Sequence, residues 1–323
     1  MKKILVTGVA GFIGSKVSEM LLKEGRCVIG IDNLNDYYDK NLKLWRLNNL
    51  KESMNFKFYQ VDIENFSDLK NVFTKHRFDV VINEAARAGV RYSLKNPFIY
   101  LTTNAGGTLN LLELCKEYDI SKFILASTSS LYAGEKMPFK EELSVNKPIS
   151  PYAASKKAAE AIAYSYHYLY GIDVTVLRYF TVYGPGGRPD MSPFRFIKWI
   201  IEDNPIEIFG DGSQERDFTY IDDIAKGTIK AIKPLGYEVI NLGNNHPDKL
   251  STAIKLIEKY VDKKADFKYR EFYKADMKAT WADISKAKKL LDWQPQVRLE
   301  EGIKRTVEWT KDNWKWVQNI EVK

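Results

Sequence analysis

The chain has 323 residues, of which 45% are hydrophobic and 28% are charged, so it is typical of a soluble globular protein with one large core or two moderate ones. No apolar run approaches the ~20 residues of a membrane-spanning helix. The only cysteines, Cys27 and Cys115, lack metal-ligand spacing, and the net charge of +7 comes from lysines spread along the whole chain. These features argue against a membrane protein, a nucleic-acid-binding protein and a metal site, and they fit a reduced cytoplasm.

Short apolar segments alternate with helical segments from the N-terminus to about residue 180. Such alternation is typical of a parallel sheet with helices on both faces. The expected strands cover 4–8, 27–32, 56–63, 79–86, 122–128 and 173–180, and the two longest expected helices cover 104–118 and 152–170.

The first expected strand runs into the glycine-rich segment VTGVAGFIG, which opens a helix. Gly8, Gly11 and Gly14 have the roles of a dinucleotide-binding turn: a tight bend, close approach of a pyrophosphate, and close helix–strand packing. The first helical residues, Phe12 and Ile13, offer free N–H groups to phosphates. This pattern predicts a Rossmann-type domain with a bound dinucleotide.

Asp32 ends the second expected strand, where a carboxylate can accept hydrogen bonds from adenosine ribose hydroxyls and repel a 2′-phosphate. No arginine follows directly in IDNLND, so NAD is favoured over NADP. Asn33 is expected beside it, and Asp62 with Ile63, at the end of the third strand, suits a contact with the adenine edge.

Past the fifth expected strand, the segment SPYAASKKAAEA reads as a helix capped by Ser150. Tyr152 and Lys156 lie at i and i+4 on one face. A solvated lysine and a packed tyrosine would explain this spacing, but beside a dinucleotide it suits hydride chemistry. A lysine ammonium stabilises phenolate, so it can make tyrosine a base for an alcohol proton. The strand end ASTSSLY offers hydroxyls, among them Ser127 and Thr128, for the same oxygen.

Beyond Phe180 the chain changes character. The segment VYGPGGRPDMSP is rich in glycine and proline and is expected to be a loop, and short helices and strands mix after it. We predict a nucleotide-binding domain over 1–179 and a smaller, discontinuous, mixed α/β substrate lobe over 180–323. The segment 218–231 is expected to return to the first domain.

TGVAGFIG, Asp32, ASTSSLY and YAASK together resemble the extended short-chain dehydrogenase/reductase family, in its branch that modifies nucleotide sugars. The resemblance implies that Tyr152 is the catalytic base, that Lys156 assists it and that Thr128 completes the triad. It also implies cofactor contacts from Ala85, Ala86, Asn104 and Tyr179.

The residues after Thr128 distinguish the reactions of this branch. The related 4,6-dehydratases carry an Asp-Glu pair there and the UDP-glucuronate decarboxylases carry a Glu, whereas this chain has Ser129 and Ser130. The resemblance therefore implies oxidation at C4 followed by re-reduction from the other face, which is 4-epimerisation.

Three stretches resemble the UDP-glucuronate 4-epimerases: DNLNDYYDKNLKLWRL, AGVRYSLKNP and RYFTVYGPGGRPDM. The resemblance implies that Thr181 and Arg188 hold the sugar carboxylate and that Arg91 contacts the substrate. It assigns Arg216 to the diphosphate, where its planar fork suits phosphate oxygens, and Asp276 to the uridine ribose.

Two family elements are altered in this chain. The usual PGD appears as KAD over 274–276, with Tyr273 before it, and the usual HLAAQAG appears as NEAARAG. Asn83, Glu84 and Arg87 are the changed residues of the second element, and Ala133 replaces a usual glycine.

Other functions remain open at this point. They are a 4-epimerase of a neutral UDP-hexose such as UDP-glucose, a UDP-glucuronate decarboxylase, and a non-catalytic NAD-binding module. The resemblance also implies a homodimer, formed when the helices over 104–118 and 152–170 of two subunits pack as a four-helix bundle.

Overall fold

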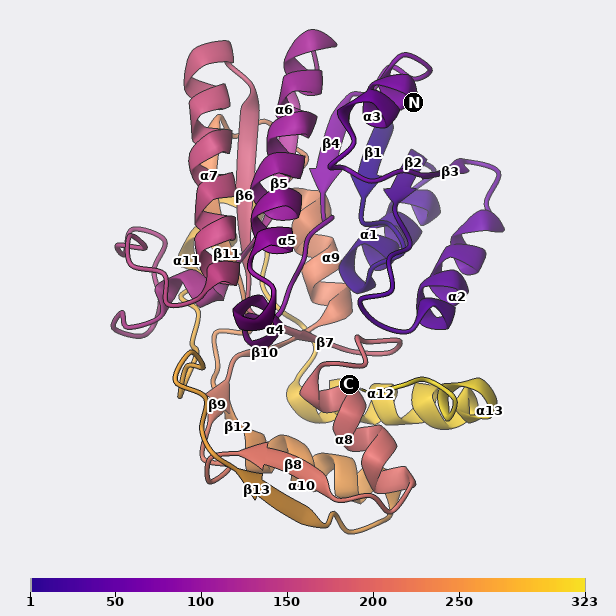
Figure 1. Ribbon diagram of the computed structural model, residues 1–323, viewed down its shortest axis with the longest axis vertical. Coiled ribbons are helices and arrows are strands. Elements are labelled where there is room, and N and C mark those ends of the chain that lie inside the picture. Colours follow the sequence, from indigo (N-terminus) through magenta and orange to yellow (C-terminus); the bar gives the residue numbers. More distant parts are fainter. Residues whose placement is uncertain (1, 323) are drawn as a thin grey trace.

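The computed structural model describes residues 2–322, which form an upper lobe around a seven-stranded sheet and a smaller lower lobe (Figure 1). All pairs in the large sheet are parallel, and the strand order is β11-β6-β5-β4-β1-β2-β3. The predicted α/β fold class is confirmed. The strands are β1 (Lys3–Thr7), β2 (Cys27–Asp32), β3 (Phe56–Gln60), β4 (Val80–Asn83), β5 (Lys122–Thr128), β6 (Asp173–Tyr179) and β11 (Tyr237–Leu242).

The apolar runs of the central strands supply both faces of the sheet because successive side chains point to opposite sides. In β1, Ile4 and Val6 enter one hydrophobic core, while Leu5 enters the other. In β4, Val80 and Ile82 likewise enter the first core, while Val81 enters the second. This explains why these strands read as continuous apolar runs.

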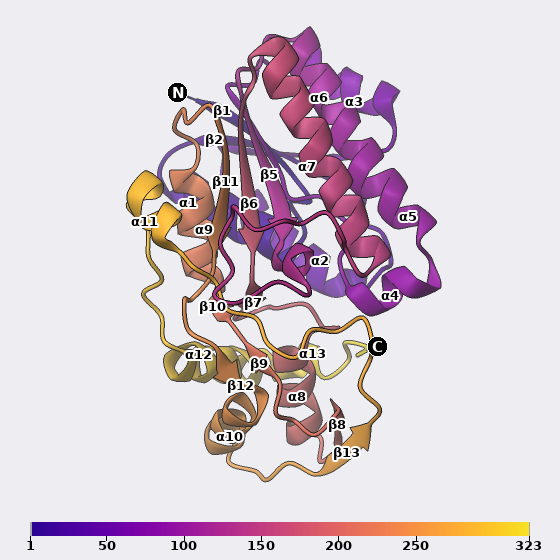
Figure 2. The ribbon, with the colours of Figure 1, turned by 90° about the vertical axis from the view of Figure 1, so that its left-hand side faces the viewer.

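Helices cover both faces of the sheet (Figure 2). One face carries α1 (Phe12–Lys23), α9 (Ile221–Lys230) and α11 (Ser285–Leu291), with α2 (Lys40–Lys51) beyond α1; the other carries α3 (Phe66–Phe73), α6 (Gly107–Glu117) and α7 (Pro151–Tyr170). Helix α7 begins as expected, because the Ser150 hydroxyl accepts a hydrogen bond from the Ala153 N–H and Pro151 occupies the first turn.

Three expectations about secondary structure need correction. The third and fourth strands end at Gln60 and Asn83, so the polar residues after them lie in loops. The helix expected over 104–118 is α6 preceded by a π-helical segment, η1 (Leu101–Gly106), and by α5 (Phe98–Tyr100), so Asn104 lies in the π segment. The edge strand β11 was not foreseen.

The lower lobe is built from residues beyond β6. It contains its own apolar core, to which Phe196, Ile208, Ile254 and Ile303 contribute. Short strand pairs, β10 with β7, β12 with β9 and β13 with β8, accompany its helices. Its elements are β7 (Thr181–Tyr183), α8 (Ser192–Ile201), β8 (Ile206–Phe209), β9 (Glu215–Arg216), β10 (Phe218–Tyr220), β12 (Asp248–Lys249), α10 (Leu250–Val261), β13 (Phe267–Arg270), α12 (Leu299–Asp312) and α13 (Trp314–Val317).

The carboxyl ends of the upper strands point toward the lower lobe (Figure 1). The short α4 (Val90–Lys95) and the 3₁₀ segment η2 (Ser129–Tyr132) lie at this edge, after β4 and β5. In open parallel sheets this is the edge at which ligands bind. Over residues 2–322, none of the helices combines the length and apolar character needed to cross a bilayer.

Candidate active site

A cavity of about 970 Å³ lies between the carboxyl edge of the sheet and the lower lobe. It is lined by residues of β2, β5 and β6, by the loops that follow β1, β3 and β4, and by residues of the lower lobe. Every predicted site residue except Asn104 lines it: Gly8, Gly11, Phe12, Ile13, Gly14, Asp32, Asn33, Asp62, Ile63, Ala85, Ala86, Arg91, Ser127, Thr128, Tyr152, Lys156, Tyr179, Thr181, Arg188, Arg216 and Asp276.

The glycine turn has no room for side chains. Gly8 has a φ of +64°, and a Cβ there would lie 2.7 Å from the backbone nitrogen of Ala85. A Cβ on Gly11 would lie 2.8 Å from the Gly8 carbonyl oxygen, and one on Gly14 would collide with the same oxygen. Helix α1 starts at Phe12 with no side-chain cap. Its first N–H groups are therefore available to an anion, as a bound pyrophosphate requires.

The acidic residues at the ends of β2 and β3 are fixed by local hydrogen bonds. Asp32 accepts from the Ala10 N–H at 3.1 Å through one oxygen and from the Leu34 N–H at 2.8 Å through the other. The Asn33 amide donates to Asp62 at 2.7 Å. Each carboxylate oxygen keeps a free lone pair. The arrangement leaves the Asp32 carboxylate held in place and able to accept a ribose hydroxyl.

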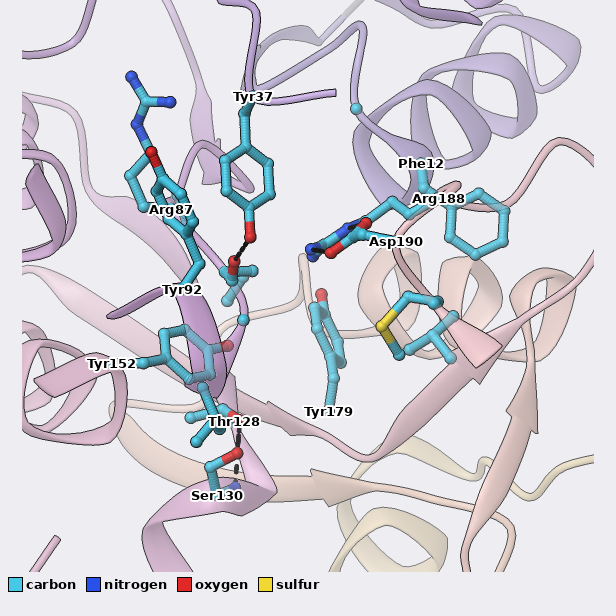
Figure 3. A pocket seen from close by; sticks show the side chains of 18 of the residues that line it. Phe12, Tyr37, Arg87, Tyr92, Thr128, Ser130, Tyr152, Tyr179, Arg188 and Asp190 are labelled. Carbon is cyan, nitrogen blue, oxygen red and sulfur yellow. Dashed lines mark hydrogen bonds and ion pairs between the residues drawn. The ribbon is translucent and has the colours of Figure 1, made fainter. Parts of the chain in front are cut away.

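Tyr152, Thr128 and Lys156 meet at the end of β5 (Figure 3 shows the first two). The Thr128 hydroxyl accepts from the Ser130 N–H and donates to the Ser130 hydroxyl, both at 3.1 Å. The Lys156 ammonium donates to the Ala126 carbonyl at 2.8 Å, and only 4% of the residue is exposed. The structure thus brings together the three residues that the sequence predicted to form a triad.

The electrostatics differ from the expectation in one respect. Burial raises the pKa of Tyr152 above its ordinary value, while the Thr128 hydroxyl and the charge of Arg188 act in the opposite direction. Burial lowers the pKa of Lys156 to about 8, against the charges of Glu84 and Glu160. The protein by itself therefore does not produce the lowered tyrosine pKa that the sequence led us to expect.

The side chains of two predicted site residues form hydrogen bonds with neighbouring protein groups. The Ser127 hydroxyl donates to Glu160 at 2.6 Å, beneath the sheet edge, so Thr128 is the better placed hydroxyl for a ligand. Asn104 lies behind the cavity wall. Its side chain accepts from the Arg87 N–H at 2.8 Å and donates to the Arg87 carbonyl at 2.9 Å, which fixes the loop after β4.

Arg188 lines the cavity, and Figure 3 shows its guanidinium beside Asp190. Its Nε and Nη2 donate to the two carboxylate oxygens of Asp190, and it stacks 5.7 Å from the Tyr37 ring centroid. Burial acts to lower the pKa of Arg188, but the charge and hydrogen bonds of Asp190 raise it above its ordinary value. One edge of the guanidinium is thereby occupied, and the Nη1 side remains for a second carboxylate. Thr181, at the start of β7, also lines the cavity.

A buried arginine on α2 joins the cofactor turn to the Arg188 loop. The Arg46 guanidinium donates to the carbonyls of Ala10 at 3.1 Å, Gly186 at 2.6 Å and Gly187 at 3.2 Å. Only 3% of Arg46 is exposed. This residue was not singled out from the sequence, because nothing local distinguishes it from a surface arginine of a helix.

The far end of the cavity holds a cluster that bridges the two lobes. Arg91, on α4, donates to Asp276 at 2.6 Å and stacks 3.7 Å from the Phe209 ring centroid. Tyr273 flanks the same guanidinium at 4.9 Å. Arg216 lies nearby on β9 and donates to the Lys278 carbonyl at 3.2 Å. Cations and aromatic rings in one place suit a nucleoside diphosphate.

Phe209 and Glu84 are cavity residues that the sequence did not assign to the site. In the sequence IEIF, Phe209 resembles an ordinary aromatic residue of a hydrophobic core, so no local pattern marks it as a site residue. Glu84 was visible as a departure from the family motif. Its carboxylate accepts from the Tyr179 hydroxyl at 2.6 Å, and burial raises its pKa to about 7.

The fold and cavity define a dinucleotide-binding enzyme of the extended short-chain dehydrogenase/reductase type. Residues 5–306 match the GDP-mannose 4,6 dehydratase family, and the chain belongs to that family. The predicted family relationship is confirmed.

Individual relatives and solved structures that resemble the chain include several UDP-sugar 4-epimerases. The chain is 61% identical to a UDP-glucuronate 4-epimerase of Thermodesulfobacterium geofontis over 98% of this chain and 99% of that one. It is 41% identical to the Bacillus cereus UDP-glucuronic acid 4-epimerase solved with UDP-glucuronic acid and NAD, with a TM-score of 0.91 over 96% and 99% of the two chains. A UDP-glucose 4-epimerase of Thermotoga maritima, solved with UDP-glucose, is 34% identical, with a TM-score of 0.88 over 97% and 99%.

Proposed function

We propose that this protein is an NAD-dependent UDP-glucuronate 4-epimerase, which interconverts UDP-glucuronate and UDP-galacturonate through a transient 4-keto sugar. The observation that carries the proposal is that one cavity contains the glycine turn, the Tyr152 hydroxyl and the Arg188 guanidinium. The identity of 61% with a UDP-glucuronate 4-epimerase favours this function over a neutral UDP-hexose epimerase.

The residues present fit NAD. The free N–H groups at the start of α1 suit the pyrophosphate, Asp32 suits the adenosine ribose, and Lys156 suits the nicotinamide ribose. When bound, NAD takes the hydride from C4 of the sugar and returns it to the opposite face, its ring being cationic when oxidised and neutral when reduced.

Tyr152 handles the proton. As tyrosinate, its oxygen accepts the proton of the C4 hydroxyl while the carbonyl forms, and the resulting phenol donates the proton back when the carbonyl is reduced. Thr128 holds the same sugar oxygen from the end of β5. The buried Lys156 ammonium supplies the positive charge that favours tyrosinate. Because both faces of C4 must be presented, the keto sugar turns while the nucleotide stays anchored near Arg216 and Asp276.

Arg188 and Thr181 hold the sugar carboxylate. The 4-keto intermediate is a β-keto acid, which loses CO₂ when its carboxylate stands perpendicular to the carbonyl plane. Charge-assisted hydrogen bonds from the free edge of Arg188 keep the carboxylate in another orientation. Ser129 and Ser130 replace the acidic residues with which related enzymes carry out further chemistry.

The functional unit is proposed to be a cytoplasmic homodimer that pairs α6 and α7 of two subunits. The exposed apolar side chains on these helices support this assembly. They include Leu109 of α6 and Tyr164, Tyr168 and Leu169 of α7.

The test is proton NMR of the purified protein with UDP-glucuronate and no added reductant. A new anomeric signal of UDP-galacturonate is expected, and it should be lost with Tyr152→Phe while NAD binding is retained. A UDP-pentose product would instead assign decarboxylation. An unchanged spectrum, with conversion of UDP-glucose under the same conditions, would assign the neutral-hexose activity.

A further inference from the structure

Glu84 is a carboxylic acid in the cofactor cavity for which the proposed mechanism has no use. It directly follows β4, and its side chain reaches past the end of β5 to Tyr179, the last residue of β6. Among residues 2–322, no lysine, arginine or histidine forms an ion pair with it. The resemblance to HLAAQAG implies leucine at this position, where this chain carries a carboxylic acid.

The hydrogen-bond chain around Glu84 can be counted in protons. The Tyr179 hydroxyl lies 2.6 Å from Glu84 Oε1 and 2.8 Å from Thr228 Oγ1, and Thr228 Oγ1 lies 2.9 Å from the Ile224 carbonyl oxygen. Three contacts need three protons, but the two hydroxyl groups supply only two. A protonated Glu84 completes the chain, whereas an ionised Glu84 leaves one contact without a proton. The site therefore exists in two states that differ by one proton and one charge.

The nearby Lys156 ammonium favours the ionised state of Glu84, and the Glu84 charge in return favours the charged ammonium. The other acid that acts on Lys156, Glu160, is already neutralised by two hydrogen bonds from Arg178, at 2.9 Å and 2.7 Å. When it is ionised, Glu84 therefore adds a negative charge at the Lys156 end of the cavity that no arginine neutralises.

We infer that the Glu84 carboxylate favours the oxidised over the reduced form of the bound dinucleotide. This inference rests on the proposed function, which places the nicotinamide at the Tyr152–Lys156 end. A negative charge there attracts the cationic oxidised ring and has no comparable attraction for the neutral reduced ring. Hydride leaves C4 with two electrons and the hydroxyl proton goes to Tyr152, so Glu84 forms and breaks no bond.

The benefit for an epimerase is that the reduced intermediate stays short-lived. If the keto sugar left before re-reduction, the enzyme would be stranded with reduced cofactor. A carboxylate that destabilises the reduced state relative to the oxidised state speeds return of the hydride.

The experiment measures dissociation constants of NAD⁺ and NADH for nucleotide-free protein, by calorimetry, for wild type, Glu84→Gln and Glu84→Leu. Both variants remove the charge, and Gln keeps a hydrogen-bonding group for Tyr179. We expect both to lower the preference for NAD⁺ over NADH by about tenfold. Glu207→Gln, at the far end of the cavity, is the matched control and should leave the ratio unchanged.

Three outcomes would overturn the inference. A wild-type ratio in Glu84→Gln would mean that the charge has no effect on the cofactor. A change in Glu84→Leu alone would assign Glu84 to positioning Tyr179. If the wild-type protein binds neither NAD⁺ nor NADH, the proposed function itself is wrong. This outcome is distinct from the first two because it is seen without any variant.

Discussion

Tyr152 has to lose a proton in the proposed reaction, although its surroundings favour the protonated phenol. Burial is the largest influence on its pKa, and Thr128 and Arg188 only partly oppose it. The Lys156 ammonium directs one of its three N–H groups to the Ala126 carbonyl. In the proposed reaction, the positive charge of oxidised cofactor would add to that of Lys156 in favouring tyrosinate, so proton abstraction would depend on a loaded cofactor site.

The first prediction concerns Arg188. Arg188→Leu removes the guanidinium that we assign to the sugar carboxylate, and epimerisation of UDP-glucuronate should fall by about 100-fold, the loss of a charge-assisted, forked contact. A UDP-pentose product should appear because the carboxylate is free to turn. Both are measured by proton NMR of the products. Wild-type turnover without a pentose would contradict the assignment, and Arg188→Lys, which keeps the charge without the fork, is the control.

The second prediction concerns the pH dependence of stability. Burial raises the pKa of Glu84 from 4.5 to about 7, so the native state holds a proton that the unfolded chain releases at lower pH. The stability that this proton supplies is present in full below about pH 4.5 and is lost as the pH rises through about 7. At 1.36 kcal/mol per pKa unit, the free energy of unfolding should fall by about 3 kcal/mol at most over this pH range.

Glu84→Gln should lack this loss. Its free energy of unfolding relative to wild type should increase between pH 5 and pH 8 in urea titrations of nucleotide-free protein. A constant difference across this range would show that Glu84 ionises alike in the folded and unfolded chains.

At the scale of single residues, the sequence located candidate hydroxyls at the end of a strand, but it did not give the direction in which each side chain points. ASTSSLY locates hydroxyls at the carboxyl edge, but neighbouring strand residues point to opposite sides. Ser127 therefore meets Glu160, while Thr128 faces the cavity. Asn104 could not be placed either, because a π-helical segment changes the direction of every side chain it carries.

At the scale of elements, the junction of β1 and α1 depends on glycine. A Cβ on Gly14 would collide with the Gly8 carbonyl oxygen, so Gly14→Ala should force the turn apart. We expect NAD affinity, measured by calorimetry, to fall by at least about tenfold, a cost of about 1.4 kcal/mol.

Gly106→Ala is the matched control for this change. Outside the adjoining turn of its helix, its added Cβ would approach no atom closer than the Leu101 carbonyl oxygen, at 4.0 Å, and its backbone has an ordinary negative φ. NAD binding that is equally weak in both variants would show that the turn is not the cause.

The strands of the upper lobe were largely predictable because buried parallel strands are short continuous apolar runs. The edge strand β11 was not, since YEVINL follows the glycine- and proline-rich break and its pairing with β6 joins residues far apart in the sequence. The two-stranded pairs of the lower lobe could not be predicted either, because their strands are very short: β9 consists of Glu215 and Arg216. Such pairing is set by the tertiary structure rather than by local propensity.

At the scale of the whole molecule, the face of α6 and α7 is the proposed dimer contact. Leu109→Glu should place a charge within this face and convert the dimer to a monomer in light scattering coupled to size-exclusion chromatography. Leu44→Glu on α2 is the matched control, because the two leucines are 39% and 41% exposed. A monomeric control, or a dimeric Leu109 variant, would place the contact elsewhere.

The buried guanidinium of Arg46 has a consequence for how the two ligands depend on one another. It holds both the turn proposed for the cofactor and the loop proposed for the sugar carboxylate, so ordering one of them restrains the other. Such linkage is reciprocal: if cofactor raises the affinity for nucleotide sugar, nucleotide sugar raises the affinity for cofactor by the same factor. A protein built in this way retains its cofactor longest when substrate is abundant.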